Sequence, residues 1–167
     1  MNNMTYKIRR PTAKDAKIVR KMSGDLERAM AALFKNQGMP DFAKEPAIEA
    51  RFSTKTHAKW FAGITGKDID LDHLWCVLEV DGNVGGYIYA KVVEKNSKGH
   101  LDSLYILKEY RGNGYAIELV KHVIKWFKSK KVRFVDISVD APNHPAKKLY
   151  EKLGFVCTSY HYNKKLS

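Results

Sequence analysis

The sequence predicts a single α/β domain in which helices cover both faces of a mixed, mostly antiparallel central sheet of six to seven strands. The length of 167 residues, 44% of them hydrophobic, suits one core, so we expect one domain over residues 1–167. Apolar residues alternate with a period of two in several segments and recur at helical spacing in others. These segments follow one another as strand, helices, three strands, helix, strand, helix and final strands.

The N-terminal part begins with a short predicted strand over 6–9 and continues into a helix that starts near Thr12. Asp15 follows Thr12 by three residues, a spacing close to that of a capping box. Apolar residues then recur at helical spacing until an Asn-Gln-Gly-Met-Pro segment over 36–40 ends the helix. A second, less regular helix is expected over 46–64.

Three central strands are expected next. The first two, over 75–80 and 84–93, are joined by a turn that contains Asp81 and Gly82, a dipeptide that strongly favours a β-hairpin. The third strand, over 101–107, leads into a glycine-containing loop and then into an amphipathic helix.

The C-terminal third predicts one more strand over 132–139, a short helix, and one or two final strands over 155–162. Asn143 can cap the N-terminus of the short helix. Gly154 stands where the end of that helix needs a left-handed residue. The whole order therefore predicts a sheet covered by helices.

Composition and charge restrict the classes of function. Lysine and arginine number 30 against 18 acidic residues, and the formal charge of +12 favours an anionic ligand. The basic residues form separate clusters, which argues against nucleic acid as the partner. Cys76 and Cys157 lie in apolar segments without metal-ligand spacing, so we expect buried, reduced thiols and no metal. No segment resembles a signal peptide or a membrane span, so a cytoplasmic protein without membrane contact is expected.

The loop after the third central strand is the first motif that indicates a function. It reads Tyr-Arg-Gly-Asn-Gly-Tyr-Ala over 110–116. Gly112 and Gly114 let the backbone turn tightly and present bare N–H groups, and the following helix adds the positive end of its dipole. Arg111 supplies a fixed cation. Because neither the Walker pattern nor the dinucleotide-binding fingerprint is present, the sequence predicts a phosphate-binding loop of another kind.

Two motifs together resemble those of the GNAT superfamily of N-acetyltransferases. The first, Arg/Gln-x-x-Gly-x-Gly/Ala, is matched by Arg111, Gly114 and Ala116. The second, Asn-x-x-Ala-x-x-Leu-Tyr-x-x-x-Gly-Phe, is matched over 143–155, and the clear resemblance covers roughly residues 101–155. The resemblance implies a GNAT-like fold and an acetyl-coenzyme A (acetyl-CoA)-dependent enzyme. Such an enzyme transfers the acetyl group to a primary amine by direct attack in a ternary complex.

The resemblance also implies which residues bind acetyl-CoA. Its pyrophosphate is expected on the backbone amides of 112–116, and its pantetheine along 104–107 like an added strand. The thioester is expected between the strand over 101–107 and the strand over 132–139, with a backbone N–H near Ile106 stabilising the oxyanion. The candidate cofactor-binding residues are Leu104, Ile106, Leu107, Arg111, Gly112, Asn113, Gly114, Tyr115, Ala116, Asn143 and Lys147.

Acetyl transfer to an amine needs a base for the acceptor ammonium and an acid for the leaving thiolate. The family motif gives the acid role to Tyr150, and a phenol suits it because its reference pKa lies close to that of a thiol. Core packing is the alternative role for this tyrosine. His100 and Asp102 lie two residues apart on one face of a strand and are the candidates for the base. A water relay is the alternative to both, and His100 could instead face solvent at the strand entry.

Two other functions stay open at this point: a non-catalytic CoA-binding regulatory module and, with less support, a basic nucleic-acid-binding domain. The acceptor is open too, and small amines, antibiotics, amino acids, protein N-termini and lysines all qualify. In the GNAT fold the acceptor is selected mainly by the N-terminal helices and loops, here 12–72, where the resemblance is weakest. The oligomeric state is also open, with a homodimer as one option.

Overall fold

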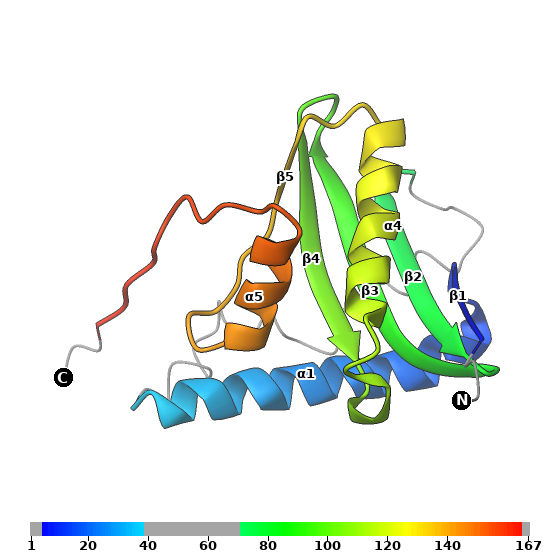
Figure 1. The fold of residues 1–167 in the computed structure, drawn as a ribbon, viewed down its shortest axis with the longest axis horizontal. Coiled ribbons are helices and arrows are strands. Elements are labelled where there is room, and N and C mark those ends of the chain that lie inside the picture. Colours follow the sequence, from blue (N-terminus) through cyan, green and yellow to red (C-terminus); the bar gives the residue numbers. More distant parts are fainter. Residues whose placement is uncertain (1–4, 39–70, 165–167) are drawn as a thin grey trace.

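The computed structural model describes residues 5–38 and 71–164 (Figure 1). These residues form a five-stranded sheet in the order β1-β2-β3-β4-β5, in which the first four strands are antiparallel and β5 is parallel to β4. The elements are β1 (Tyr6–Arg9), η1 (Ala13–Asp15), α1 (Ala16–Asn36), β2 (His73–Val80), β3 (Asn83–Glu94), β4 (Lys98–Ile106), η3 (Lys108–Tyr110), α4 (Tyr115–Ser129), β5 (Phe134–Asp136) and α5 (His144–Lys152).

Two hydrophobic clusters lie on opposite faces of the sheet. Successive side chains of β2 alternate between them, so that Cys76 and Leu78 pack in the cluster with α4, whereas Trp75 and Val77 pack in the cluster with α1. Figure 1 shows α4 nearly parallel to the strands and the long α1 crossing their direction. The predicted mixed sheet with helices on both faces is thereby confirmed.

Local signals in the sequence predicted the hairpin and the first helix correctly. Asp81 and Gly82 have φ angles of +47° and +83°, and two successive positive values are what a type I′ hairpin turn requires. At the start of the first helix, the carboxylate of Asp15 accepts a hydrogen bond of 2.6 Å from the N–H of Thr12. The helix predicted over 46–64 lies outside the described residues.

Two predicted strand segments differ from the structure. Of the strand predicted over 132–139, only three residues form β5, because β4 pairs with it only from Lys98 to His100. The strands predicted over 155–162 do not form, and the described sheet has five strands instead of six to seven. Alternation shows that a segment suits a strand, but a strand also needs a neighbouring edge. Cys157, predicted as buried, is exposed because it lies in this unpaired segment.

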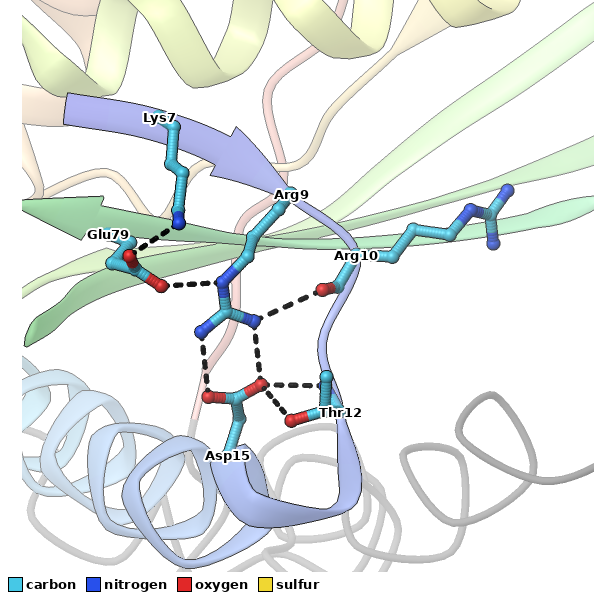
Figure 2. A network of polar contacts seen from close by, with 6 residues as sticks. All are labelled: Lys7, Arg9, Arg10, Thr12, Asp15 and Glu79. Atoms are coloured by element: carbon cyan, nitrogen blue, oxygen red, sulfur yellow. Dashed lines mark hydrogen bonds and ion pairs between the residues drawn. The ribbon is translucent and has the colours of Figure 1, made fainter. Parts of the chain in front are cut away.

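A polar network around Arg9 joins β1, η1 and β2 (Figure 2). The guanidinium donates to the carboxylate of Asp15 at 2.8 and 3.0 Å and to that of Glu79 at 2.7 Å. Lys7 lies 2.8 Å from the second oxygen of Glu79. The hydrogen bonds from Arg9 lower the pKa of Asp15 to about 2, although burial of the carboxyl acts in the opposite direction. This network fixes the entry into α1 against the edge of the sheet.

Asp15→Asn is expected to destabilise the fold by on the order of 1–3 kcal/mol, because Arg9 loses a charged partner. The folded-state pKa of Asp15 lies below its ordinary value of 3.8. Its carboxylate therefore contributes stability above about pH 4, and this contribution is lost as the pH falls toward about 2. Urea unfolding between pH 6 and pH 2 should show a steeper loss of stability in the wild type than in Asp15→Asn.

Lys7→Ala is the matched control, because the Lys7 side chain is 63% exposed and contacts the same network. Its removal should change the free energy of unfolding by less than about 0.5 kcal/mol. Equal pH dependence in the wild type and Asp15→Asn would contradict the role given to Asp15.

Candidate active site

Strands β4 and β5 diverge after a short parallel pairing, and this fork organises the candidate site. The pairing ends at His100 and Asp136. Beyond them, β4 continues to Ile106 while pairing only with β3 within the described residues, so its other edge is open over 101–106. Figure 1 shows the chain after β5 moving away from β4 toward α5. The resemblance to the GNAT superfamily implies that the thioester lies between two strands that diverge in this way.

The open edge of β4 presents the backbone groups of Ile106. The N–H of Leu107 donates to the carbonyl of Gly85 at 2.9 Å, so Leu107 faces β3. Backbone groups of successive residues in an antiparallel pair point alternately toward and away from the neighbour, which turns those of Ile106 away from β3. A hydrogen bond confirms that the carbonyl of Ile106 points away from β3, because this carbonyl accepts from Nε of Arg111 at 2.8 Å. The N–H of Ile106 faces this edge too, as the predicted oxyanion role requires.

The glycine loop leads into an uncapped helix. Gly112 and Gly114 have φ angles of +83° and +78°. Gly114 is the N-cap residue of α4, and no side chain in the described part of the chain caps the helix. A β-carbon at either glycine would meet no described atom within 4 Å. No described atom therefore crowds the two glycines, and the first amides of α4 lie without a side-chain cap at the positive end of the helix dipole, an arrangement that fits a pyrophosphate.

Arg111 and Asn113 hold the loop in its conformation. Besides its bond to Ile106, the guanidinium of Arg111 lies 5.3 Å from the ring centroid of Tyr105. Asn113 Nδ2 donates to the carbonyls of Tyr110 and Arg111 at 3.2 and 3.3 Å. Both predicted ligand residues therefore have structural partners, and a phosphate contact by the terminal nitrogens of Arg111 stays a prediction.

The remaining predicted cofactor residues contribute in different ways. The side chain of Tyr115 is buried with its ring centroid 5.2 Å from that of Tyr6, so only its backbone amide, in the first turn of α4, is a candidate for ligand contact. Asn143 Oδ1 accepts from the N–H of Ala146 at 3.3 Å and so caps α5 as predicted. Lys147 is partly exposed on the same helix. Leu104, Leu107 and Ala116 pack against the two hydrophobic clusters.

Tyr150 is buried on α5, where its ring makes an edge contact with Phe155 at 5.4 Å between centroids. Its hydroxyl has no hydrogen-bond partner within the ranges that the structure describes. Burial raises the pKa of the phenol, so Tyr150 stays protonated to higher pH than an ordinary tyrosine. The residue is thus part of the core and also keeps a neutral O–H that could donate to a ligand.

His100 lies between two carboxylates, with 25% of its side chain exposed. Its Nδ1 is 2.7 Å from Oδ1 of Asp136, and its Nε2 is 3.9 Å from Oδ1 of Asp102. Lys91 Nζ lies 3.3 Å from the same oxygen of Asp102, and Lys98 Nζ lies 2.8 Å from the second oxygen of Asp136. The structure therefore brings the two predicted base candidates together and adds Asp136, which the sequence analysis missed.

The sequence signal for Asp136 is weak. It is the polar residue between Val135 and Ile137 in an apolar alternating segment, a position that usually faces solvent. Its register opposite His100 comes from a parallel pairing across 36 residues, which local patterns do not encode. Burial alone would raise the pKa of Asp136, but hydrogen bonds from Lys98 and His100 lower it below its usual value. Asp136 is therefore ionised near neutral pH.

Residues 5–38 and 71–164 contain neither a metal-binding cluster nor a membrane-spanning helix. No group of His, Cys, Asp and Glu side chains there is placed to hold a metal ion. No helix there combines the length and the apolar character needed to cross a membrane.

The fold and the site define an α/β domain of the acetyltransferase type, and sequence comparison gives the family. The model of the acetyltransferase (GNAT) family matches residues 34–155. The chain belongs to this family.

Two of the curated relatives are named for N-terminal or N-alpha acetylation. The N-terminal acetyltransferase B complex catalytic subunit NAA20 of Arabidopsis thaliana is 39% identical over 85 residues, which are 48% of each chain. An N-alpha-acetyltransferase of Sulfurisphaera tokodaii is 36% identical over 90 residues, which are 47% of this chain and 54% of the relative. The chain spans about half the length of the curated relatives it matches.

Solved structures resemble the chain over nearly its whole length. The PaiA N-acetyltransferase from Thermoplasma acidophilum, in complex with coenzyme A, has a TM-score of 0.74 and 18% identity, and covers 95% of this chain and 94% of its own. The aminoglycoside N-acetyltransferase AAC(6')-Iy, also in complex with CoA, has a TM-score of 0.67 and 16% identity over 99% of this chain and 97% of its own. At this identity the likeness shows the GNAT-like fold.

Gly114→Val is expected to abolish binding of coenzyme A, because its side chain would fill the open space over the first amides of α4. Valine at a positive φ also strains the backbone, so the matched control is Gly82→Val, in the hairpin between β2 and β3. Its φ of +83° and its open surroundings resemble those of Gly114. Both variants should lose thermal stability, but calorimetry should show lost affinity for Gly114→Val alone. Unchanged affinity in a folded Gly114→Val protein would refute the assignment of the loop.

Proposed function

We propose that this protein is an acetyl-CoA-dependent N-acetyltransferase that acts by direct attack in a ternary complex, with protein N-termini as its acceptors. The observation that carries the proposal is the open edge of β4 beside the uncapped N-terminus of α4. The hydrogen bond from Arg111 to the carbonyl of Ile106 joins these two features at 2.8 Å. An extended ligand with a pyrophosphate at one end could therefore contact both of them.

The residues present fit acetyl-CoA. The amides at the start of α4 and the free nitrogens of Arg111 would hold the pyrophosphate, and the formal charge of +12 would attract it. The backbone N–H and carbonyl of Leu104, which face away from β3, would pair with an amide of pantetheine, and the N–H of Ile106 is left for the thioester oxygen. The coenzyme supplies the acyl group in activated form, as a thioester.

The side chains then have separate tasks in acetyl transfer. His100 or Asp102 removes one proton from the acceptor ammonium, and the neutral amine attacks the thioester carbonyl carbon. The new C–N bond forms and the C–S bond breaks while the N–H of Ile106 stabilises the negative charge on the carbonyl oxygen. Tyr150 gives its proton to the leaving thiolate. The amine nitrogen loses a second proton when the amide forms, and this proton goes to the phenolate oxygen of Tyr150. The tyrosine is thereby restored and the step balances.

Protein N-termini are the acceptor class that the curated relatives favour. The two relatives described above are named for N-terminal or N-alpha acetylation, and their matched segments are 39% and 36% identical to this chain. An α-amino group has a reference pKa of about 7.7–8.0, against about 10.4 for a lysine side chain. A larger fraction of it is neutral at physiological pH, so an α-amine makes a smaller demand on the base.

Wild-type protein with acetyl-CoA should release thiol with peptides that carry a free N-terminus. The same peptides with a blocked N-terminus and an internal lysine should give a kcat/KM lower by at least about 10-fold. Acetyl-CoA should raise the Tm, and random duplex DNA should not. Binding of acetyl-CoA without turnover of any amine would instead support a regulatory module. Turnover of small amines only would keep the activity and overturn the acceptor.

Tyr150→Phe should lower kcat by roughly 10²-fold or more, because it removes the proposed proton donor and keeps the packing of the ring. The affinity for acetyl-CoA, measured by calorimetry, should change little. Phe155→Leu is the control, since it disturbs the same aromatic contact and keeps the hydroxyl; it should affect stability more than kcat. A raised KM with normal kcat in Tyr150→Phe would indicate that the hydroxyl binds the cofactor, and full activity would indicate core packing.

A further inference from the structure

We propose that His100 is the general base and that Asp136 is its positioning residue, an assignment that rests on the proposed acetyl transfer. The two residues face each other at the last paired position of β4 and β5. Their contact spans the fork at the point where the open edge of β4 begins. A base held there stands beside the segment expected to hold the thioester.

The contact between the two side chains determines which ring nitrogen carries the proton. An ionised carboxylate can only accept hydrogen bonds, and Oδ1 of Asp136 lies 2.7 Å from Nδ1 of His100. Nδ1 therefore carries the hydrogen, and the neutral ring has its lone pair on Nε2. The same hydrogen bond holds the orientation of the ring, as a carboxylate does for histidine in other sites that use Nε2.

Asp102 is less suited to accept the proton. The ammonium of Lys91 lies 3.3 Å from Oδ1 of Asp102, the oxygen that also faces His100. The ammonium of the acceptor would be repelled by the ammonium of Lys91 if it approached the same oxygen of Asp102. The charged groups that face the His100 ring are Lys91 from β3, Lys98 and Asp102 from β4, and Asp136 from β5.

In the proposed step, Nε2 of His100 takes one proton from the acceptor ammonium and leaves a neutral amine. Asp136 stays ionised and accepts from Nδ1 before and after the transfer, so its charge offsets that of the imidazolium. The imidazolium returns its proton to solvent after the acetyl group has moved. No bond other than N–H is made or broken at His100.

A merely structural role for Asp136 has to be separated from this one. The carboxylate also contacts Lys98 at 2.8 Å, and this ion pair could simply hold β4 against β5. Lys98→Ala removes that contact and leaves the bond between His100 and Asp136 in place. The side chain of Lys98 is 47% exposed, so its loss should cost little stability.

Asp136→Asn keeps the shape of the side chain and removes its charge. Its kcat should fall by about 10-fold to 10²-fold, with the affinity for acetyl-CoA unchanged by calorimetry. The acidic limb of its kcat/KM profile should move to lower pH, because loss of a neighbouring negative charge disfavours the imidazolium. Lys98→Ala should keep its turnover. Equal losses in both variants would show that Asp136 only holds the strands, and an acidic limb that persists in His100→Gln would overturn His100 as the base.

Nitrogen NMR of the imidazole tests the assignment without any turnover. In the wild type, neutral His100 should show the tautomer protonated on Nδ1, and Asp136→Asn should reduce its population. A ring protonated on Nε2 in the wild type would overturn the proposal whatever the acceptor is. If the expected tautomer is present and no amine is acetylated, the proposed function has failed instead, and with it the catalytic role of the pair.

Discussion

The short parallel pairing between β4 and β5 is the constraint on which the site depends. Buried or half-buried backbone groups need partners, and β4 loses those on one edge when the chain turns away after Asp136. A bulge in β4 lies at the same place: Tyr89 pairs with Ser103 and Ala90 with Leu101, which leaves Asp102 as the extra residue. Bulges bend a strand and increase its twist. The divergence is thus built into the backbone, and a ligand with amide groups could complete the edge.

The helix N-termini differ in how their first amides are capped. Asn143 caps α5, and the carboxylate of Asp15 accepts from Thr12 at the start of the first helical segment. In contrast, α4 begins at Gly114 without a side-chain cap in the described part of the chain. A protein cap there would satisfy the same amides that a pyrophosphate needs. The helix is held instead by its apolar face, which packs against β2, β3 and β4.

Features with a local cause could be predicted from the sequence, and features that depend on distant partners could not. The hairpin turn at Asp81, the capping contact of Asp15 and the left-handed glycines all follow from the few residues around them. The length of β5 and the contact between His100 and Asp136 depend on the register of two strands that are far apart in sequence. An alternating pattern does not say which residues of two strands lie opposite each other. Asp136 could therefore not be distinguished from a residue that faces solvent.

Burial of Tyr150 bears on its proposed role as proton donor, because the raised pKa makes the phenol a weaker acid. The free energy of a proton transfer depends on the difference between the pKa of the donor and the pKa of the acceptor, and not on either pKa alone. A thiolate that leaves into the same buried environment is desolvated too, and burial raises the pKa of thiols as it raises that of phenols. The match between the two groups is therefore kept. Burial also keeps the phenol neutral over the working pH range, as a proton donor must be before the transfer.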